Sequence, residues 1–407
     1  MYIERAIEKT VREISTTFPV LLLTGPRQCG KTTMLKYLAA EGRNYVTMDD
    51  PDVRKLARND PSLFMQRYTP PVIIDEIQYA PEILPYIKMY VDNSGKMGEF
   101  WLTGSQLFHS MKNVTESMAG RVGIVQLAGL SSCEISGTGS EPFTIDSQRL
   151  LERLKTAKKL SLQEIFRRIW LGSMPALYAN DKLDRDRFWM SYVDTYLKRD
   201  IADLTQVADE SAFLTFMEVA AAHTGRPVVY QELALDAGIS APTAKKWLSL
   251  LVSSQLAVLI EPYHNNVLKR AVKMPLLHFM DTGLCAYLLK WNSPQTLERG
   301  AMSGALFESW VFSEIYKSWQ NAGHRPPVYY YRDKDKREID LLLNYDGLLY
   351  PVEIKKTGSP GEKTVKNFSV LNNGQQGQAT GPGAVICMAS DLLPIDRNNW
   401  AVPAWMI

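Results

Sequence analysis

Short apolar runs alternate with helical patterns over residues 1–140. The chain opens with apolar side chains at helical spacing, which predicts an amphipathic helix through Ile3, Ile7, Val11 and Ile14. The apolar runs that follow predict buried strands at Val20–Leu23, Tyr45–Met48, Val72–Ile74 and Phe100–Leu102. Strands that alternate with helices favour a parallel sheet with helices on both faces. The pattern therefore predicts an α/β fold for this part of the chain.

The middle of the chain is mainly helical. Residues from about Leu150 to Leu204 show helical patterns with a break at Gly172–Pro175. A further helix is followed by a predicted helix at Tyr230–Ala237, a turn at Gly238 and a second helix at Pro242–Ser253. Two predicted strands come next, at Leu256–Ile260 and Met274–Phe279. Two helices joined by a short turn and followed by a strand pair are typical of a winged helix-turn-helix.

The last hundred residues predict a second α/β domain. A helical pattern at Leu306–Trp319 is followed by four strand-like segments: Val328–Arg332, Glu338–Leu343, Leu349–Ile354 and Ala384–Met388.

The linker composition of Ser136–Pro142 favours a boundary near residue 140. We therefore expect a first α/β domain at 1–140, a helical connector at 141–210, a winged helix at 211–290 and a last domain at 291–407.

Composition excludes several classes of protein. Hydrophobic residues make up 45% and charged residues 22% of the 407 positions, which excludes a disordered, collagen-like or coiled-coil chain. Lys+Arg 46 against Asp+Glu 44 leaves a net charge of +2, so any nucleic-acid surface must be a local patch. The four cysteines form no CxxC pair, which is typical of a reduced intracellular protein. The opening residues are too charged for a signal peptide, and no run of about 18 apolar residues occurs, so we expect a cytoplasmic protein without a membrane span.

A complete phosphate-binding motif joins the first strand to the next helix. The pattern G-x-x-x-x-G-K-[ST] is matched by Gly25, Pro26, Arg27, Gln28, Cys29, Gly30, Lys31 and Thr32, with Thr33 after them. Amide N–H groups of such a loop cradle phosphate oxygens at a helix N-terminus. Lys31 would reach the β- and γ-phosphates of ATP, and the Thr32 hydroxyl would ligate Mg²⁺. An ordinary glycine turn does not account for both the strand before the motif and the helix after it.

Two acidic residues follow the apolar strand that begins at Pro71. Asp75 at the strand end is placed to hold Mg²⁺, and Glu76 to act as the general base for the attacking water. An acidic pair after a strand is more often a solvated strand end. Beside a phosphate loop, the catalytic interpretation is favoured.

Residues of two further segments are candidates for contact with the γ-phosphate. Thr103, Ser105 or Gln106 would sense that phosphate or position water, unless they only form a turn after their strand. Arg121 is a candidate arginine finger and equally a candidate surface arginine.

The predicted winged helix carries basic residues. Lys245 and Lys246 on its second helix, with Lys269, Arg270 and Lys273 in the wing, are placed to contact DNA phosphates. Winged helices also pair proteins or domains, so both interpretations stay open.

An acidic constellation marks the last domain. Asp340 lies on one strand and Glu353 with Lys355 on its hairpin partner, where alternation puts Glu353 and Lys355 on one face. Asp340 and Glu353, with Glu308 from the preceding helix, would hold Mg²⁺ or Mn²⁺, and Lys355 would steer or deprotonate water. This is the arrangement of metal-dependent nucleases. Scattered charges on a half-solvated hairpin are the alternative.

The order of these parts resembles the prokaryotic AAA-type ATPases that end in the domain of unknown function 4143. The resemblance rests on GPRQCGKTT, VIIDEIQ, FWLTGSQ, AGRV, TYLKRDI, FMDTGL, EIDLLL and VEIKK. It implies a P-loop AAA-type parallel sheet, a winged helix and a restriction-endonuclease-like domain. It also implies ATP hydrolysis at Lys31, Thr32, Asp75 and Glu76, a homo-oligomer such as a hexamer, and a role on forked or branched DNA. The chain lacks the Gly-Ala-Arg sensor of many AAA proteins, which leaves Arg121 unassigned.

The leading hypothesis is a Mg²⁺-dependent ATPase that moves or remodels DNA and has a nuclease-like last domain. The alternatives are a nucleotide-controlled regulator, whose winged helix binds one promoter or a partner protein, and a scaffold in which the nuclease fold only docks proteins.

Overall fold

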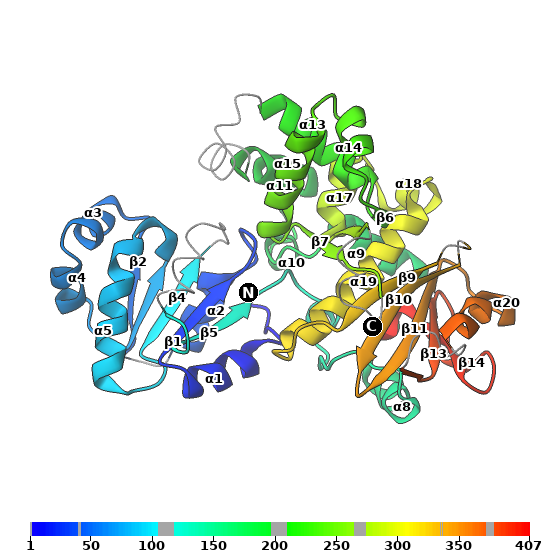
Figure 1. Cartoon of the computed structure of the whole chain (residues 1–407), viewed down its shortest axis with the longest axis horizontal. Helices are drawn as coiled ribbons and strands as arrows, with labels where there is room; N and C mark the ends of the chain where they lie inside the picture. Colours follow the sequence, from blue (N-terminus) through cyan, green and yellow to red (C-terminus); the bar gives the residue numbers. More distant parts are fainter. Residues whose placement is uncertain are drawn as a thin grey trace. The chain divides into compact units, whose positions relative to one another are not determined.

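The computed structural model divides the chain into two compact units (Figure 1). The first comprises Met1–Leu130, Ser253–Gln255 and Gln320–His324, and the second comprises Ser131–Val252, Leu256–Trp319 and Arg325–Ile407. The structure describes residues 2–39, 42–104, 118–196, 210–263, 274–333, 335, 337–371 and 378–407. Among these residues, no helix is both long enough and apolar enough to cross a bilayer.

The first unit is built on a parallel five-stranded sheet. Its strands are β1 (Val20–Thr24), β2 (Asn44–Thr47), β3 (Val72–Asp75), β4 (Phe100–Gly104) and β5 (Val122–Gln126). They are ordered β2-β3-β4-β1-β5, with every neighbouring pair parallel. The four predicted strands are confirmed, whereas β5 was not predicted. Because β1, β4 and β3 are parallel, their carboxyl ends lie at the same edge of the sheet. The end of β4 lies between the ends of β1 and β3.

Helices cover both faces of this sheet, as the alternating pattern predicts (Figure 1). One face packs against α3 (Pro51–Asn59), α4 (Pro61–Arg67) and α5 (Leu84–Ser94). The other face packs against α1 (Glu8–Thr17) and α2 (Lys31–Leu38). The first helix begins at Glu8, so the predicted start near Ile3 is wrong.

The second unit begins with helices and a small antiparallel sheet. Its helices up to residue 299 are α7 (Ser132–Ser136), α8 (Ser147–Thr156), α9 (Leu162–Leu171), α10 (Ala176–Ala179), α11 (Arg185–Tyr196), α13 (Glu210–Ala222), α14 (Tyr230–Asp236), α15 (Ala241–Ser253), α17 (Thr282–Leu288) and α18 (Pro294–Arg299). Its first strands are β6 (Arg226–Pro227), β7 (Ala257–Ile260) and β8 (Leu276–Phe279), ordered β6-β8-β7. The helix-turn-helix of α14 and α15 with this sheet has the winged-helix outline that the sequence predicts.

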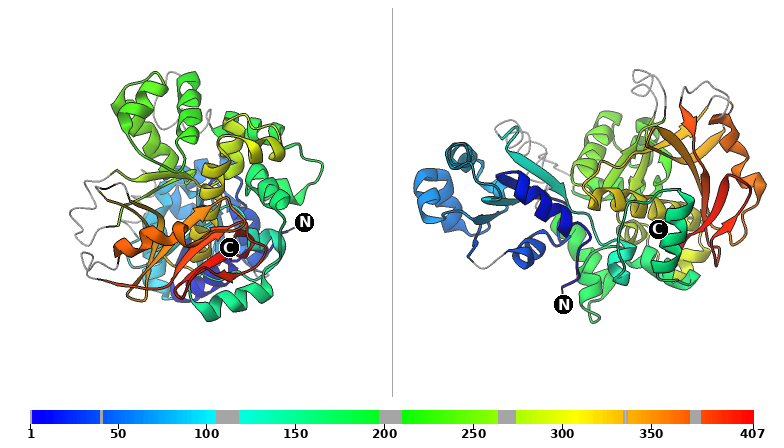
Figure 2. Two further views of the ribbon diagram at one scale, coloured as in Figure 1. Left: turned by 90° about the vertical axis from the view of Figure 1, so that its right-hand side faces the viewer. Right: turned by 90° about the horizontal axis from the view of Figure 1, so that it is seen from below.

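A long helix and a mixed sheet complete the second unit. The helices are α19 (Ser303–Asn321) and α20 (Glu362–Val365), and the strands are β9 (Val328–Arg332), β10 (Glu338–Tyr345), β11 (Leu348–Lys355), β12 (Ala379–Thr380), β13 (Gly383–Cys387), β14 (Leu393–Pro394) and β15 (Asn399–Pro403). The order is β14-β15-β13-β11-β10-β9, with β12 beside β11. In the left view of Figure 2 these orange-to-red strands lie side by side. The strands β12, β14 and β15 were not predicted.

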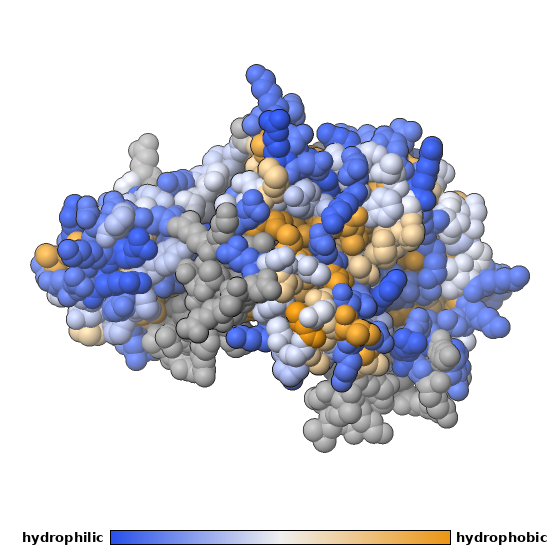
Figure 3. Space-filling model, turned by 90° about the horizontal axis from the view of Figure 1, so that it is seen from above, coloured by the Kyte–Doolittle hydropathy of each residue, from blue (hydrophilic) through white to orange (hydrophobic). Residues whose placement is uncertain are grey.

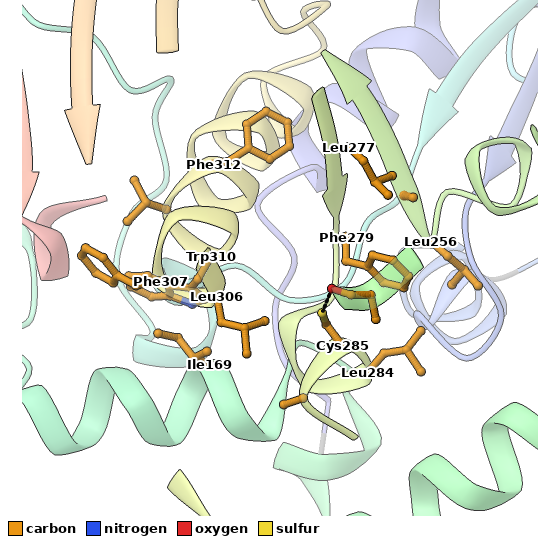
Figure 4. Packing of buried hydrophobic residues seen from close by; sticks show 14 of the residues in the cluster. Ile169, Leu256, Leu277, Phe279, Leu284, Cys285, Leu306, Phe307, Trp310 and Phe312 are labelled. Atoms are coloured by element: carbon orange, nitrogen blue, oxygen red, sulfur yellow. Dashed lines mark hydrogen bonds between the residues drawn. The ribbon is translucent and has the colours of Figure 1, made fainter. Parts of the chain in front are cut away.

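The larger of two hydrophobic clusters in the described part of the second unit links its helices to its sheets. It joins residues of α9, β8, α17 and α19, among them Ile169, Phe279, Leu284 and Phe307 (Figure 4). The Cys285 thiol in this core donates a hydrogen bond to the Ala221 carbonyl, with 3.4 Å between Sγ and O. Because the connector, winged helix and last sheet share this core, the boundaries expected at residues 210 and 290 stay predictions.

Candidate nucleotide site and a second acidic site

The phosphate-binding motif forms the turn between β1 and α2, as its sequence predicts. Gly30 precedes the first residue of α2 with a φ of 97°, a left-handed conformation that a side chain disfavours. At Gly25 an added Cβ would lie 2.2 Å from the Leu127 carbonyl oxygen. Both glycines of the motif are therefore required by the backbone of the loop.

The Lys31 side chain folds back onto this loop. Its Nζ donates to the carbonyl oxygens of Gly25 at 3.0 Å and Pro26 at 2.9 Å, and the residue is only 7% exposed. Neutral carbonyls are weaker partners for an ammonium group than charged oxygens. Phosphate oxygens in the loop can therefore replace them.

Asp75 at the end of β3 accepts hydrogen bonds from three hydroxyl groups. Thr32 Oγ1 lies 2.9 Å from Oδ1 and 3.1 Å from Oδ2, and the Tyr45 hydroxyl lies 2.9 Å from Oδ2. Thr103 Oγ1, from the intervening strand β4, donates to Oδ1. Burial and the Asp75 carboxylate raise the pKa of the Tyr45 hydroxyl, which therefore stays protonated as a donor.

These contacts fit a Mg²⁺ site. Mg²⁺ prefers hard oxygen ligands such as carboxylates and hydroxyls, and is bound through one or two protein groups besides phosphates and water. Thr32 and Asp75 supply such oxygens within hydrogen-bonding distance of each other at the mouth of the loop. Tyr45 was not predicted, because its position on an apolar strand gives no sign of its contact with Asp75.

Glu76 leaves the strand in a left-handed conformation, with φ 57° and ψ 47°. Its amide donates to Thr103 Oγ1 at 3.2 Å, and its carboxylate accepts a hydrogen bond from the Gln78 side chain. Such a conformation is uncommon for a residue with a side chain and is found mostly where a function or a tight turn requires it. The role of Glu76 as general base stays a prediction.

Arg121 forms an ion pair on the surface of the first unit. Its Nε lies 2.5 Å from Asp92 Oδ1, and the two side chains are 34% and 43% exposed. The hydrogen bond from Arg121 lowers the pKa of the Asp92 carboxyl. Arg121 as a finger stays a prediction. Ser105 and Gln106, like Lys269, Arg270 and Lys273 of the wing, lie outside the described residues.

Two of the three predicted acidic residues, Asp340 and Glu353, are brought together around one lysine. The third, Glu308 on α19, has its Oε1 4.0 Å from His278 Nε2. Lys355 Nζ lies 3.2 Å from Asp340 Oδ2 and 2.8 Å from Glu353 Oε1. The amide of Ile354 donates to the same Asp340 oxygen at 2.8 Å. The second carboxylate oxygen of Glu353 is buried and has no hydrogen-bond partner among the described residues.

Burial and mutual repulsion shape the electrostatics of this cluster. Burial and the Asp340 carboxylate raise the pKa of Glu353 to about 7. The same two causes raise the pKa of Glu308 to about 8. For Lys355, burial lowers the pKa, but Asp340 and Glu353 outweigh it and raise the value.

Within the described ranges, no group of three or more His, Cys, Asp or Glu side chains is placed to hold a metal ion. In this cluster the Lys355 ammonium lies between Asp340 and Glu353, and its positive charge balances the two carboxylates. A cation would have to displace it. The unpartnered oxygen of Glu353 nevertheless fits a cation ligand, so Asp340, Glu353 and Glu308 stay predicted ligands.

Three family models match successive parts of the chain. Residues 17–136 match an AAA domain, residues 162–295 a domain of unknown function (DUF8612) and residues 303–407 another domain of unknown function (DUF4143). Two uncharacterized proteins, of Mycobacterium bovis and Mycobacterium tuberculosis, are each 28% identical over 346 residues. The alignment covers 84% of this chain and 71% of each relative.

Two solved structures that resemble this chain are less similar to it in sequence than the two mycobacterial relatives are. The Walker-type ATPase PABY2304 of Pyrococcus abyssi is 13% identical, with a TM-score of 0.43 over 70% of this chain and 96% of that chain. A variant of Thermotoga maritima RuvB is 17% identical, with a TM-score of 0.25 over 62% of this chain and 85% of that chain. The domain assignment therefore rests on the family models and on the sheet described above.

Proposed function

Because the chain carries an AAA domain and, at its end, the domain of unknown function DUF4143, we propose that it is a Mg²⁺-dependent ATPase. The observation that carries this proposal is the grouping of Lys31, Thr32 and Asp75 at the mouth of the glycine loop. Among the described residues, the Lys31 ammonium there contacts the replaceable carbonyls of Gly25 and Pro26, and Thr32 contacts Asp75 at the end of β3.

The residues divide the work of hydrolysis. The loop amides and Lys31 hold the phosphates, while Tyr45 and Thr103 fix the orientation of Asp75. Thr32 and Asp75 would hold Mg²⁺, which neutralises charge on the phosphate oxygens. Glu76 takes a proton from the attacking water. Thr103, between the two strand ends, is placed to respond to loss of the γ-phosphate.

We extend the proposal to DNA as the partner and to a homo-oligomer such as a hexamer. Two basic side chains support a nucleic-acid surface. Lys245 and Lys246 are both exposed on α15, the second helix of the helix-turn-helix. The neighbouring α14 exposes Leu235 by 81%, which would also suit a protein partner, as a regulator would require. Figure 3 shows hydrophobic residues gathered near the middle of a largely hydrophilic face.

We expect the purified chain to turn over ATP with Mg²⁺ and to stop when EDTA removes the metal. Turnover should rise with one of a panel of single-stranded, duplex, forked and four-way DNAs, and DNA binding should weaken as salt is raised. Binding to a single sequence with a high specificity ratio, without stimulation, would instead favour the regulator. Absence of Mg²⁺-dependent turnover under all these conditions would contradict the proposed function.

A second candidate activity, cleavage of DNA in the last domain, is favoured by the cluster of Asp340, Glu353 and Lys355. Charges placed on otherwise apolar strands are costly unless they are paired or functional. Lys355 contacts one carboxylate oxygen of Glu353, and the other oxygen is left to bind a further ligand.

We expect Mg²⁺ or Mn²⁺ to support DNA cleavage that falls by about 10²-fold or more in Asp340→Asn and in Lys355→Ala. Asparagine keeps an oxygen that can accept from the Ile354 amide, so the local fold is retained. Lys363→Ala, which removes an exposed lysine of α20, is the matched control. Equal cleavage by all four proteins, or none by any, would remove this activity and favour a docking role.

A further inference from the structure

A buried arginine lies behind the phosphate loop. Arg5 is only 4% exposed, and its Nη1 donates to the carbonyl oxygen of Cys29, within the loop, at 2.9 Å. Its Nη2 donates to the carbonyl oxygens of Ala128 at 2.8 Å and Gly129 at 3.3 Å. One guanidinium thus joins two backbone segments that lie about a hundred residues apart in the sequence.

Glu8, the first residue of α1, holds Arg5 and Tyr2 in place. The Glu8 carboxylate accepts from the Arg5 amide at 2.8 Å and from the Tyr2 hydroxyl at 2.6 Å. This fixes the backbone from which the arginine side chain extends. A planar guanidinium presents several N–H groups in a rigid fork, so it can bind carbonyls of two segments at once.

The loop and the segment beyond β5 are also in direct contact. The Leu127 amide donates to the Thr24 carbonyl at 2.7 Å, immediately before the loop. The Leu127 carbonyl leaves no space for a side chain at Gly25. Residues 127–130 end the first compact unit, and Ser131 begins the second. The segment that Arg5 contacts is therefore one of the places where the chain passes between the two units.

We propose that Arg5 is a positioning residue that couples occupancy of the phosphate loop to residues 127–130. Loop amides turn toward a bound phosphate, while the Cys29 carbonyl is tied to Arg5. A change in the loop therefore reaches the carbonyls of Ala128 and Gly129 through one rigid group. The coupling rests on the proposed nucleotide site and deepens it, because it assigns the route by which nucleotide binding reaches the connection.

Hydrogen exchange of the full chain, with and without ADP and Mg²⁺, tests this coupling. In the wild type we expect ADP to protect amides both in the loop and in residues 127–130. Arg5→Lys keeps the charge but not the fork, so it should weaken ADP binding about tenfold and remove the response at 127–130. Arg5→Gln, a neutral variant, should behave likewise. Val11→Ala, which loosens packing of α1 in the same unit, should keep both responses.

The outcomes separate this inference from the proposed function. An Arg5 variant that keeps the wild-type response at 127–130 overturns the coupling, and so does a wild type in which only the loop responds. A wild type whose loop does not respond to ADP overturns the proposed nucleotide site and the coupling with it. Loss of the distant response in both Arg5 variants, with Val11→Ala unaffected, supports the coupling.

Discussion

Replacing Lys31 with alanine is expected to lower ATP turnover by about 10²- to 10³-fold, the usual cost of losing one preorganised donor to a transition state. Lys31 is buried, and among the residues that the structure describes its ammonium contacts only the carbonyls of Gly25 and Pro26. Phosphate oxygens gain a charged partner there without disrupting any other described contact of the side chain. The rate of phosphate release at saturating ATP measures the effect.

The matched control for that experiment is Lys55→Ala, the same substitution at an exposed lysine of α3. It should leave turnover within about twofold of the wild type, since exposed substitutions away from a site have small effects. Similar rates for Lys31→Ala and Lys55→Ala would mean that the loop does not carry the reaction.

Replacing Glu76 with glutamine is expected to lower the turnover number by about 10²- to 10⁴-fold, the range of a general base. The substitution keeps the size and the hydrogen-bonding capacity of the side chain but removes the proton acceptor. Nucleotide affinity should therefore change little, which distinguishes Glu76 from Lys31. The measurements are single-turnover ATP hydrolysis and the equilibrium binding of ATP.

Glu82→Gln, at an exposed acid shortly after the strand, is the control for Glu76. A Glu76→Gln enzyme with wild-type turnover would assign the base to another residue. Weakened ATP binding with an unchanged turnover number would place Glu76 in binding rather than in proton transfer.

The sheet of the first unit could be predicted from the sequence because its strands β1, β3 and β4 are unbroken apolar runs, buried along their whole length. The edge strand β5 could not. Gly123 interrupts its apolar run, and an added Cβ there would lie 2.2 Å from the Ile14 side chain of α1. That glycine serves helix packing, a tertiary requirement that no local pattern records.

The residues of the candidate sites also fall into those that the sequence predicts and those that it does not. Lys31, Thr32 and Asp75 follow from motifs whose spacing is set by one turn and two strand ends. Arg5 could not be found, because in the sequence it is one of several charges near an amphipathic helix. Its burial depends on carbonyls contributed from residues 29 and 128–129.

The FMDTGL motif shows a structural use of an acid that sequence alone leaves unassigned. Asp281 caps α17 by accepting from the amides of Gly283 and Leu284. It also accepts from the amide and hydroxyl of Ser173, at the predicted helix break. These contacts depend on two distant segments meeting, so the motif marks a packing junction within the second unit.

The central claim is that the loop from Gly25 to Thr32 binds the phosphates of a nucleotide. A crystal structure of the chain grown with ADP and Mg²⁺ tests it most directly. We expect phosphate oxygens against the loop amides, with Lys31 Nζ moved from the Gly25 and Pro26 carbonyls onto them. A loop without phosphate in saturating ADP, with Lys31 still bonded to those two carbonyls, would contradict the claim.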